Sequence, residues 1–354
     1  MPDATFDTID LDLTAHEHAA HLRAGDYSSR ALTEATLARI HAQDASLNAY
    51  ITFTDDLALE EAAAADQALA SGKAGPLTGI PVAVKDLLST KGIQTSAASK
   101  MLEGFIPIVD CTVVQRLKDA GAVIVGKTNL DEFAMGSSTE HSAFGPTHNP
   151  WDLDRVPGGS SGGSAATVAS RGVPLSLGTD TGGSIRQPAA LCGIVGLKPT
   201  YGRVSRFGVV AFASSLEQVG PFARDAEDAA HLLGAIAGDD PMDSTTAAVA
   251  VPDYTERFDR GVEGLRVAVP ETFFGDGLDA DVREAIERAI HDLQMHGAII
   301  DRDVALPAAS AALPVYYIIA PSEASANLAR YDGVKYGFSV KDGRSVEDEM
   351  AQTR

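Results

Sequence analysis

Residues 157–164 read Pro-Gly-Gly-Ser-Ser-Gly-Gly-Ser, and residues 178–187 read Gly-Thr-Asp-Thr-Gly-Gly-Ser-Ile-Arg-Gln. Glycine adopts positive φ without steric penalty and lets backbone N–H groups gather around a ligand, so such loops can bind an anion while presenting a serine hydroxyl. A flexible linker would also be rich in glycine and serine. However, the loops alternate with apolar runs at 165–169 and 173–177, which a linker lacks. The stretch therefore indicates structured loops and favours a serine-based active site.

The segments around these loops alternate between helix and strand. Residues 79–87 predict a buried strand interrupted by Lys85, residues 112–119 a helix closed by Gly121, and residues 122–125 a further strand. Later segments repeat the alternation, with helices at 226–234 and 281–295 and strands at 265–269 and 298–300. This order predicts an α/β fold whose sheet contains parallel pairs joined by crossover helices. Residues 126–221 show little periodicity, which is typical of a functional region.

Two parts of the chain differ in composition. Residues 1–75 predict an N-terminal helical flank, with one helix capped by Ser28 or Ser29 and a second one ended by Gly72. The composition changes at Pro76. We expect residues 76–354 to form the main domain, and the two parts to make one structural unit.

The charge of the chain limits its partners. With 49 acidic and 28 basic residues, the net charge is −21. Such a surface repels phosphate backbones, so nucleic-acid binding by this chain alone is disfavoured. The acidic residues are spread evenly along an otherwise ordinary sequence, which suggests a protein kept soluble in concentrated salt, as in a halophilic archaeon.

The sequence gives little support for a membrane segment, a disulfide framework or a metal site. The apolar runs are shorter than the roughly 20 residues of a membrane helix, and the start lacks a signal-peptide pattern, so we expect a cytoplasmic protein. Cys111 and Cys192 are too few for a disulfide framework and are expected to be reduced thiols. The nine histidines match no zinc-binding pattern, so we expect no metal site.

Lys85 and the loop serines are the candidate reactive groups. A lysine after an apolar strand either reaches the surface or, if buried, loses its charge readily and can act as a base. Residues 158–162 match the Gly-x-Ser-x-Gly nucleophile elbow, but no strand precedes Ser160, and no Ser-x-x-Lys pattern occurs. What remains is Lys85, Ser160 and Ser184, separated by 75 residues (85 to 160) and 24 residues (160 to 184).

At these positions the sequence resembles the amidase signature family. Within it, residues 178–190, 198–205 and 322–328 are similar to the branch that provides the glutaminase subunit of tRNA-dependent amidotransferases. The resemblance implies an amidase-signature fold, with a central mixed β-sheet covered by helices on both faces. It also implies a Ser-Ser-Lys triad in which Lys85 is the base, Ser160 the bridging serine and Ser184 the nucleophile, with a cis peptide between Gly159 and Ser160.

Physical reasoning about the residues around this triad suggests further roles. Ser184 is a weak nucleophile that needs a base, and an uncharged Lys85 could take its proton through Ser160. The N–H groups of Thr181, Gly182, Gly183 and Ser184 are expected to form the oxyanion hole. Asp180 and Arg186 are expected to fix the loop by pairing, the alternative being solvated surface charges. Ser161 and Ser164 are expected to satisfy backbone groups rather than react.

The resemblance implies that this chain hydrolyses glutamine and passes ammonia to a B subunit, which uses ATP and Mg²⁺ to convert Glu-tRNA(Gln) into Gln-tRNA(Gln). A small C subunit completes a heterotrimer, tRNA is bound mainly through the B subunit, and this chain itself needs no cofactor or membrane. Family members continue past the point that corresponds to Arg354, so the chain is expected to be incomplete at its C-terminus. A stand-alone amidase acting on another small amide and a non-catalytic truncated partner are the alternatives.

Overall fold

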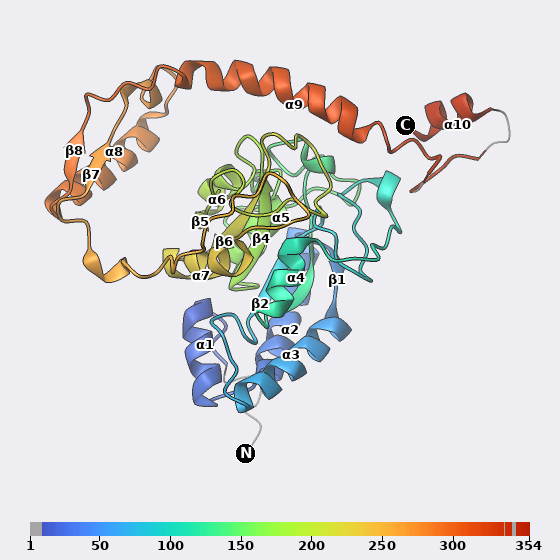
Figure 1. Ribbon diagram of the computed structural model, residues 1–354, viewed down its shortest axis with the longest axis horizontal. Coiled ribbons are helices and arrows are strands. Elements are labelled where there is room, and N and C mark those ends of the chain that lie inside the picture. The colour runs from blue at the N-terminus through green and yellow to red at the C-terminus, as the bar shows by residue number, and fades with distance from the viewer. Residues whose placement is uncertain (1–8, 336, 342–344) are drawn as a thin grey trace. The chain divides into compact units, whose positions relative to one another are not determined.

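A computed structural model of the chain describes residues 9–335, 337–341 and 345–354. They divide into two compact units, one formed by the chain up to Pro252 and from Ser322 onward, the other by Asp253–Pro321 (Figure 1). The helices are α1 (Ala15–Ala24), α2 (Ser29–Leu47), α3 (Asp55–Ala70), α4 (Thr112–Asp119), α5 (Gly162–Ala169), α6 (Arg186–Cys192), α7 (Ala226–Ile236), α8 (Ala280–Met295), α9 (Ala312–Leu328) and α10 (Val346–Thr353). The strands are β1 (Tyr50–Phe53), β2 (Pro81–Lys85), β3 (Val123–Thr128), β4 (Leu175–Asp180), β5 (Val195–Gly196), β6 (Gln218–Ala223), β7 (Arg266–Ala268) and β8 (Ile299–Asp301).

The first unit is built on a six-stranded mixed sheet in the order β1-β3-β2-β4-β6-β5. Strands β3, β2 and β4 run parallel, and the strands at either side of this trio are antiparallel to their neighbours. In β2 and β4, Val82 faces Leu175 and Val84 faces Leu177. Because the carboxyl ends of parallel strands meet at one edge, Lys85 at the end of β2 and Asp180 at the end of β4 lie at the same edge of the sheet.

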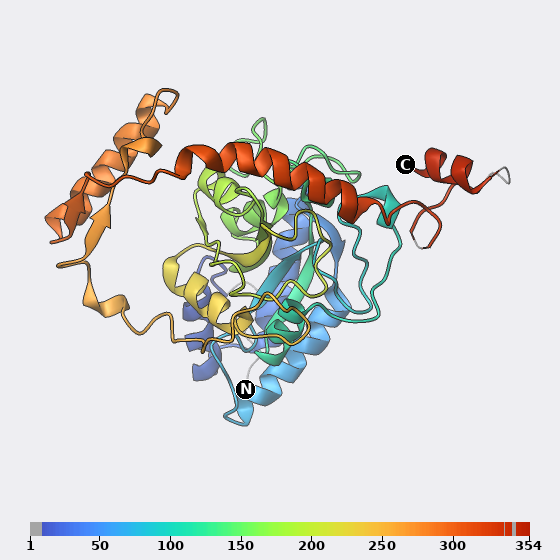
Figure 2. The same ribbon diagram turned by 45° about the horizontal axis from the view of Figure 1, so that its top comes forward.

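Helices cover both faces of this sheet. Apolar residues of α2, α3, α5 and α6 form one buried cluster with Val123 and Val125 of β3 and Ala83 of β2. Since successive side chains of a strand point to opposite faces, Val82, Val84 and Ile124 lie on the other face, where they too are buried. There α7 contacts β4 and β6 and packs against α4. Figures 1 and 2 both show α2 and α3 side by side. The expected α/β fold with a central mixed sheet is confirmed.

The second unit contains the parallel pair β7 and β8, joined by α8. Many of its large apolar side chains are exposed, including Phe273 at 61% and Ile318 at 68%. This unit was not foreseen, because the sequence pattern at Pro252 resembles that of any loop. The expected boundary at residue 76 stays a prediction.

Local signals placed most helices and strands well. Ser28 caps α2 by accepting the N–H of Ala31, and Gly72 follows the end of α3 with φ of 71°. In contrast, the beginning of α5 at Gly162 was not expected within a glycine-rich loop. Among the residues that the structure describes, every helix is too short or too polar to cross a membrane.

Candidate active site

Lys85 is completely buried at the end of β2. Its Nζ donates hydrogen bonds to Ser160 Oγ at 2.8 Å, to Ser161 Oγ at 2.9 Å and to Thr179 Oγ1 at 2.8 Å. The alternative of a lysine that reaches the surface is therefore wrong. Segments that are 75 and 94 residues away along the chain meet at this amine.

Burial is the main influence on the Lys85 amine. It lowers the pKa of Lys85 to about 7, against the opposing effects of the carboxylates of Asp131, Glu217 and Asp180. An amine with this pKa is uncharged in about half of the molecules near neutral pH. It can therefore accept a proton, as a general base requires.

The first glycine loop turns sharply beside this amine. The peptide bond between Gly159 and Ser160 is cis, and Ser161 is the residue before α5. A Cβ atom on Gly162 would lie 2.2 Å from Thr139 Oγ1, and one on Gly163 would lie 2.4 Å from the carbonyl oxygen of Ala49. These glycines therefore allow close packing of the loop, and the linker interpretation is wrong.

The second glycine loop is held by Asp180. The buried carboxylate accepts the backbone N–H of Gly183 at 2.9 Å and of Ile185 at 3.1 Å, and Arg186 donates to it through Nη2 at 2.9 Å and Nε at 3.1 Å. Although burial opposes it, these hydrogen bonds hold the pKa of Asp180 below its usual range. The expected pair between Asp180 and Arg186 is thus present, and the alternative of two solvated charges is wrong.

The two loops are joined directly. The backbone N–H of Ser161 donates to the carbonyl oxygen of Ser184 at 3.3 Å, and Ser184 is 9% exposed. Gln187 links a third segment, because its Oε1 accepts the N–H of Gly159 at 2.9 Å and its Nε2 donates to the carbonyl oxygen of Ser137 at 2.9 Å. The fold therefore brings Lys85, Ser160 and Ser184 into one site.

Four backbone N–H groups were expected to form an oxyanion hole. The N–H of Gly183 donates to Asp180 within the loop. This donor is therefore used to shape the turn. The N–H groups of Thr181, Gly182 and Ser184 remain the candidates for an oxyanion hole.

Thr179 is a polar residue of the site that was not recognised in the sequence. Thr179 accepts from Lys85, and Ser161 does so while donating to the carbonyl oxygen of Thr179 at 3.1 Å. The expectation that Ser161 and Ser164 serve backbone groups is confirmed, since Ser164 Oγ donates to the carbonyl oxygen of Leu177 at 2.9 Å. A usable signal for Thr179 was its place at the carboxyl end of a strand parallel to that of Lys85.

Two buried carboxyl groups also face this region. Asp131 is fully buried, and its backbone N–H donates to the carbonyl oxygen of Ser160 at 3.2 Å. Glu217 is 3% exposed and accepts the N–H of Phe212 at 2.9 Å. Burial raises the pKa of Glu217 to about 7. Neither residue belongs to a pattern that the sequence alone makes visible.

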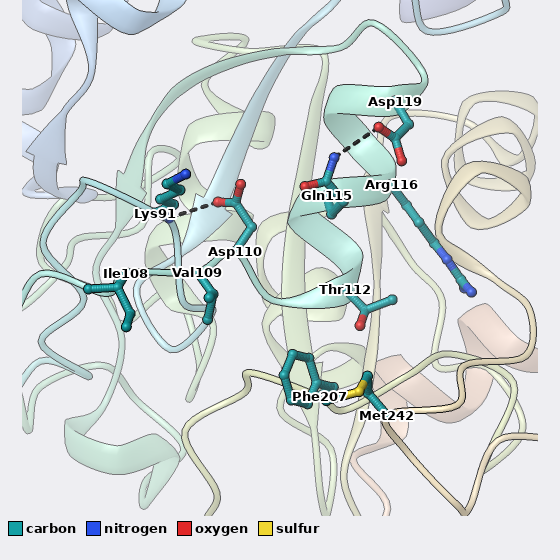
Figure 3. Close-up of a pocket in the computed structure, with 10 residues that line it drawn as sticks. All are labelled: Lys91, Ile108, Val109, Asp110, Thr112, Gln115, Arg116, Asp119, Phe207 and Met242. Carbon is teal, nitrogen blue, oxygen red and sulfur yellow. Dashed lines mark hydrogen bonds between the residues drawn. The ribbon is translucent and has the colours of Figure 1, made fainter.

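A surface pocket of about 460 Å³ lies elsewhere on the first unit (Figure 3). Residues of α4 and the segment before it line this pocket, together with Phe207 and Met242. Figure 3 shows the backbone N–H of Lys91 bonded to Asp110 and Gln115 bonded to Asp119, so these polar groups already have partners. The lining includes none of the site residues described above.

One group of side chains in the described ranges has the composition of a metal site. His16, Asp225 and Asp228 bring their ligand atoms within 4.8 Å of one another. Asp228 accepts the N–H groups of Ala15 at 2.6 Å and His16 at 2.9 Å, so its carboxylate already joins α1 to α7. We assign this group a structural role.

Comparison with known proteins supports the catalytic interpretation of the fold. Residues 31–354 match the family model described as Amidase. The chain is 58% identical over 341 residues to the A subunit of the glutamyl-tRNA(Gln) amidotransferase of Alkalilimnicola ehrlichii. The aligned region covers 96% of this chain and 70% of that protein. It is also 55% identical over 343 residues to the protein of the same name from Carboxydothermus hydrogenoformans, covering 97% of this chain and 70% of that protein.

Solved structures give the same result. The crystal structure of the A subunit of glutamyl-tRNA(Gln) amidotransferase from Thermotoga maritima superposes with a TM-score of 0.80 at 43% identity, covering 96% of this chain and 69% of that one. Native peptide amidase from Stenotrophomonas maltophilia superposes with a TM-score of 0.82 at 39% identity, covering 90% of this chain and 67% of that one. The chain therefore belongs to the amidase family.

Proposed function

We propose that the chain is the glutamine-hydrolysing subunit of a tRNA-dependent amidotransferase. The observation that carries this proposal is the 58% identity, over 96% of the chain, to the A subunit of a glutamyl-tRNA(Gln) amidotransferase. The buried contact of 2.8 Å between Lys85 and Ser160 supports the chemistry that such a protein needs. In the proposed complex, ammonia from glutamine serves to convert Glu-tRNA(Gln) into Gln-tRNA(Gln).

Acylation begins at Ser184 in this proposal. Its hydroxyl passes a proton to Ser160 while Ser160 passes its own proton to the uncharged Lys85 amine. Ser184 Oγ attacks the side-chain amide carbon of glutamine, and the N–H groups of Thr181, Gly182 and Ser184 stabilise the negative oxygen of the tetrahedral intermediate.

Collapse of the intermediate breaks the carbon–nitrogen bond. The proton held by Lys85 returns through Ser160 to the leaving nitrogen, which departs as ammonia and leaves a glutamyl ester on Ser184. Water then enters and passes a proton to Ser160, which passes its own proton to the uncharged Lys85 amine, as in acylation. Its attack on the ester carbon breaks the bond to Ser184 Oγ, which takes back the proton from Lys85 through Ser160, so glutamate is released and the serine is regenerated.

The assembly is also part of the proposal. A B subunit would bind ATP, Mg²⁺ and most of the tRNA, a C subunit would join the two larger chains, and the complex would work in the cytoplasm. The net charge of −21 supports this division of labour, because an acidic chain repels the phosphate backbone of tRNA. Within this scheme Lys85, Ser160 and Ser184 need no metal or cofactor of their own.

A glutaminase assay tests the proposal. The chain is co-purified with candidate B and C subunits, and ammonia release from glutamine is measured for the wild type and for Ser184→Ala. We expect the substitution to abolish release, by at least about 10³-fold, while the far-ultraviolet circular dichroism stays unchanged. Retained turnover in Ser184→Ala would refute the assignment of the nucleophile.

A stand-alone amidase acting on another small amide is a second candidate. The superposition on a peptide amidase, with a TM-score of 0.82, supports this candidate. The same assay separates the two functions, since an amidotransferase subunit should release ammonia from glutamine much faster after the B and C subunits are added. Equal rates with and without them, together with faster hydrolysis of a peptide amide, would support the stand-alone enzyme.

A further inference from the structure

Asp131 is a buried carboxylate that the proposed relay does not use. It lies three residues after β3 and is 0% exposed. Its backbone N–H binds the carbonyl oxygen of Ser160, and its side chain is so close to Gly159 that a Cβ atom there would lie 2.1 Å from Asp131 Oδ2. The same side chain would lie 2.3 Å, at Cγ, from a Cβ atom on Gly136. The carboxylate thus packs directly against the peptide that presents Ser160.

The hydrogen bonds of this carboxylate are long. The N–H of Ser138 donates to Oδ2 and the N–H of His141 donates to Oδ1, each at 3.3 Å. A carboxylate offers about four acceptor sites, and its burial is unfavourable unless a cation or strong donors compensate. Asp131 favours the ammonium form of Lys85, and among the carboxylates that oppose the lowering of the Lys85 pKa its effect is the largest.

The other charged groups around Lys85 are already engaged. Asp180 pairs with Arg186, and Asp86, next to Lys85 in the chain, pairs with buried Lys127 at 3.2 Å. Glu217 is protonated in part near neutral pH, since burial raises its pKa to about 7. Asp131 is therefore the group best placed to balance a positive charge that forms on Lys85.

We propose that Asp131 is a positioning residue for the proton relay, which holds the Gly159–Ser160 peptide in place and balances the ammonium charge when Lys85 takes up the proton. The inference rests on the proposed roles of Lys85, Ser160 and Ser184. It assigns Asp131 no contact with the substrate. It adds a fourth group, drawn from the segment after β3, to the machinery of the site.

Asp131→Asn separates charge from shape, because the amide keeps an acceptor oxygen and nearly the same volume. The assay is the rate at which a fluorophosphonate probe labels Ser184, measured from about pH 5.5 to about pH 9 on the full chain. This reaction needs the relay but no particular amide substrate. Loss of the negative charge makes the ammonium form of Lys85 less favourable, so the acid limb of the pH profile should move to lower pH by about one unit. The plateau rate should fall by about tenfold, because the base is weaker and its charge is no longer balanced.

Asp228→Asn is the matched control. Asp228 is also a buried carboxylate, 1% exposed, but it joins α1 to α7. Its removal should lower stability and leave the pH profile of labelling unchanged. A merely structural Asp131 would give the same result as this control, with a lower melting temperature and an unmoved acid limb, and that result would overturn the proposal.

Folding and the proposed function are tested separately. If Asp131→Asn does not fold, Asp131→Ser takes its place, since a hydroxyl can still accept the N–H of Ser138 without a charge; if neither variant folds, the carboxylate is structural and the proposal fails. If the Ser184→Ala variant were labelled as fast as the wild type, that result would instead refute the proposed function. An unmoved acid limb in a variant that still labels at Ser184 refutes the role of Asp131 alone.

Discussion

Replacing Lys85 by Met tests whether the buried amine really is uncharged near neutral pH. Met fills a similar volume and does not titrate, so the variant removes one ionisable group from a fully buried position. Burial lowers the pKa of folded Lys85 from 10.5 to about 7. Between these two values the folded chain binds fewer protons than the unfolded chain, so this group opposes folding increasingly as the pH falls.

The size of the effect follows from that window. Above pH 10.5 Lys85 is uncharged in both states and does not change the free energy of unfolding. As the pH falls, Lys85 lowers the free energy of unfolding, and the decrease is complete below a pH of about 7. Each pH unit inside the window changes the free energy of unfolding by about 1.4 kcal/mol. Between about pH 6 and about pH 9, roughly two units lie within the window, so the contribution of Lys85 changes by about 3 kcal/mol.

The measurement is urea unfolding of the wild type and Lys85→Met at both pH values. The difference in unfolding free energy between the two proteins should change by about 3 kcal/mol, with the wild type gaining relative stability at the higher pH. Lys73→Met is the control, because Lys73 is exposed and its amine lies in water in both states. A change below about 0.5 kcal/mol would mean that Lys85 stays charged in the folded protein, and the argument for a neutral amine base would fail.

Three further outcomes are expected. Gly163→Ala should destabilise the chain by at least about 2 kcal/mol in thermal or urea unfolding, because its Cβ atom would lie 2.4 Å from a backbone oxygen. The control Gly275→Ala has open space around its Cβ atom and should have little effect. Equal effects of the two substitutions would contradict the packing role of Gly163. Ser161→Ala should slow labelling of Ser184 by about tenfold, since it removes one of three acceptors of the Lys85 amine, and an unchanged rate would leave Ser161 with its backbone role alone. The net charge of −21 predicts a melting temperature that rises by several degrees from about 0.1 M to about 2 M KCl, and a flat response would count against adaptation to salt.

Local sequence signals were sufficient for most of the secondary structure. The helix expected at 112–119 is α4, with the same first and last residues, because an apolar period and a following glycine define it without outside help. The helix that begins at Gly162 was missed, since glycine disfavours helices. Close packing explains the two glycines at its start, because Gly162 lies against Thr139 and Gly163 against Ala49 and Asn129. Tertiary contacts overrule local preference at that point.

The sequence identified the serines of the candidate site, but it could not decide whether Lys85 is buried. The serines stood out by their glycine-rich context, but whether Lys85 is buried depends on what packs around it, and its own neighbours in the sequence do not decide this. Asp131 and Thr179 remained hidden for a related reason. Each contributes through a partner far away in the chain or through a backbone group of another loop. The place of Thr179 near the carboxyl end of a strand was a usable signal, whereas the sequence contains none for Asp131.

The three hydroxyl contacts of Lys85 also fix which serine can be the relay. An ammonium carries three hydrogens, one for each of Ser160, Ser161 and Thr179, but an uncharged amine carries two hydrogens and a lone pair. One hydroxyl must then turn around and point its own hydrogen at the nitrogen. Ser161 has committed its hydrogen to the carbonyl oxygen of Thr179, so it cannot turn without breaking that bond. The number of hydrogens on the Lys85 nitrogen thus excludes Ser161 as the relay, and Ser160 remains free to exchange its proton with the amine.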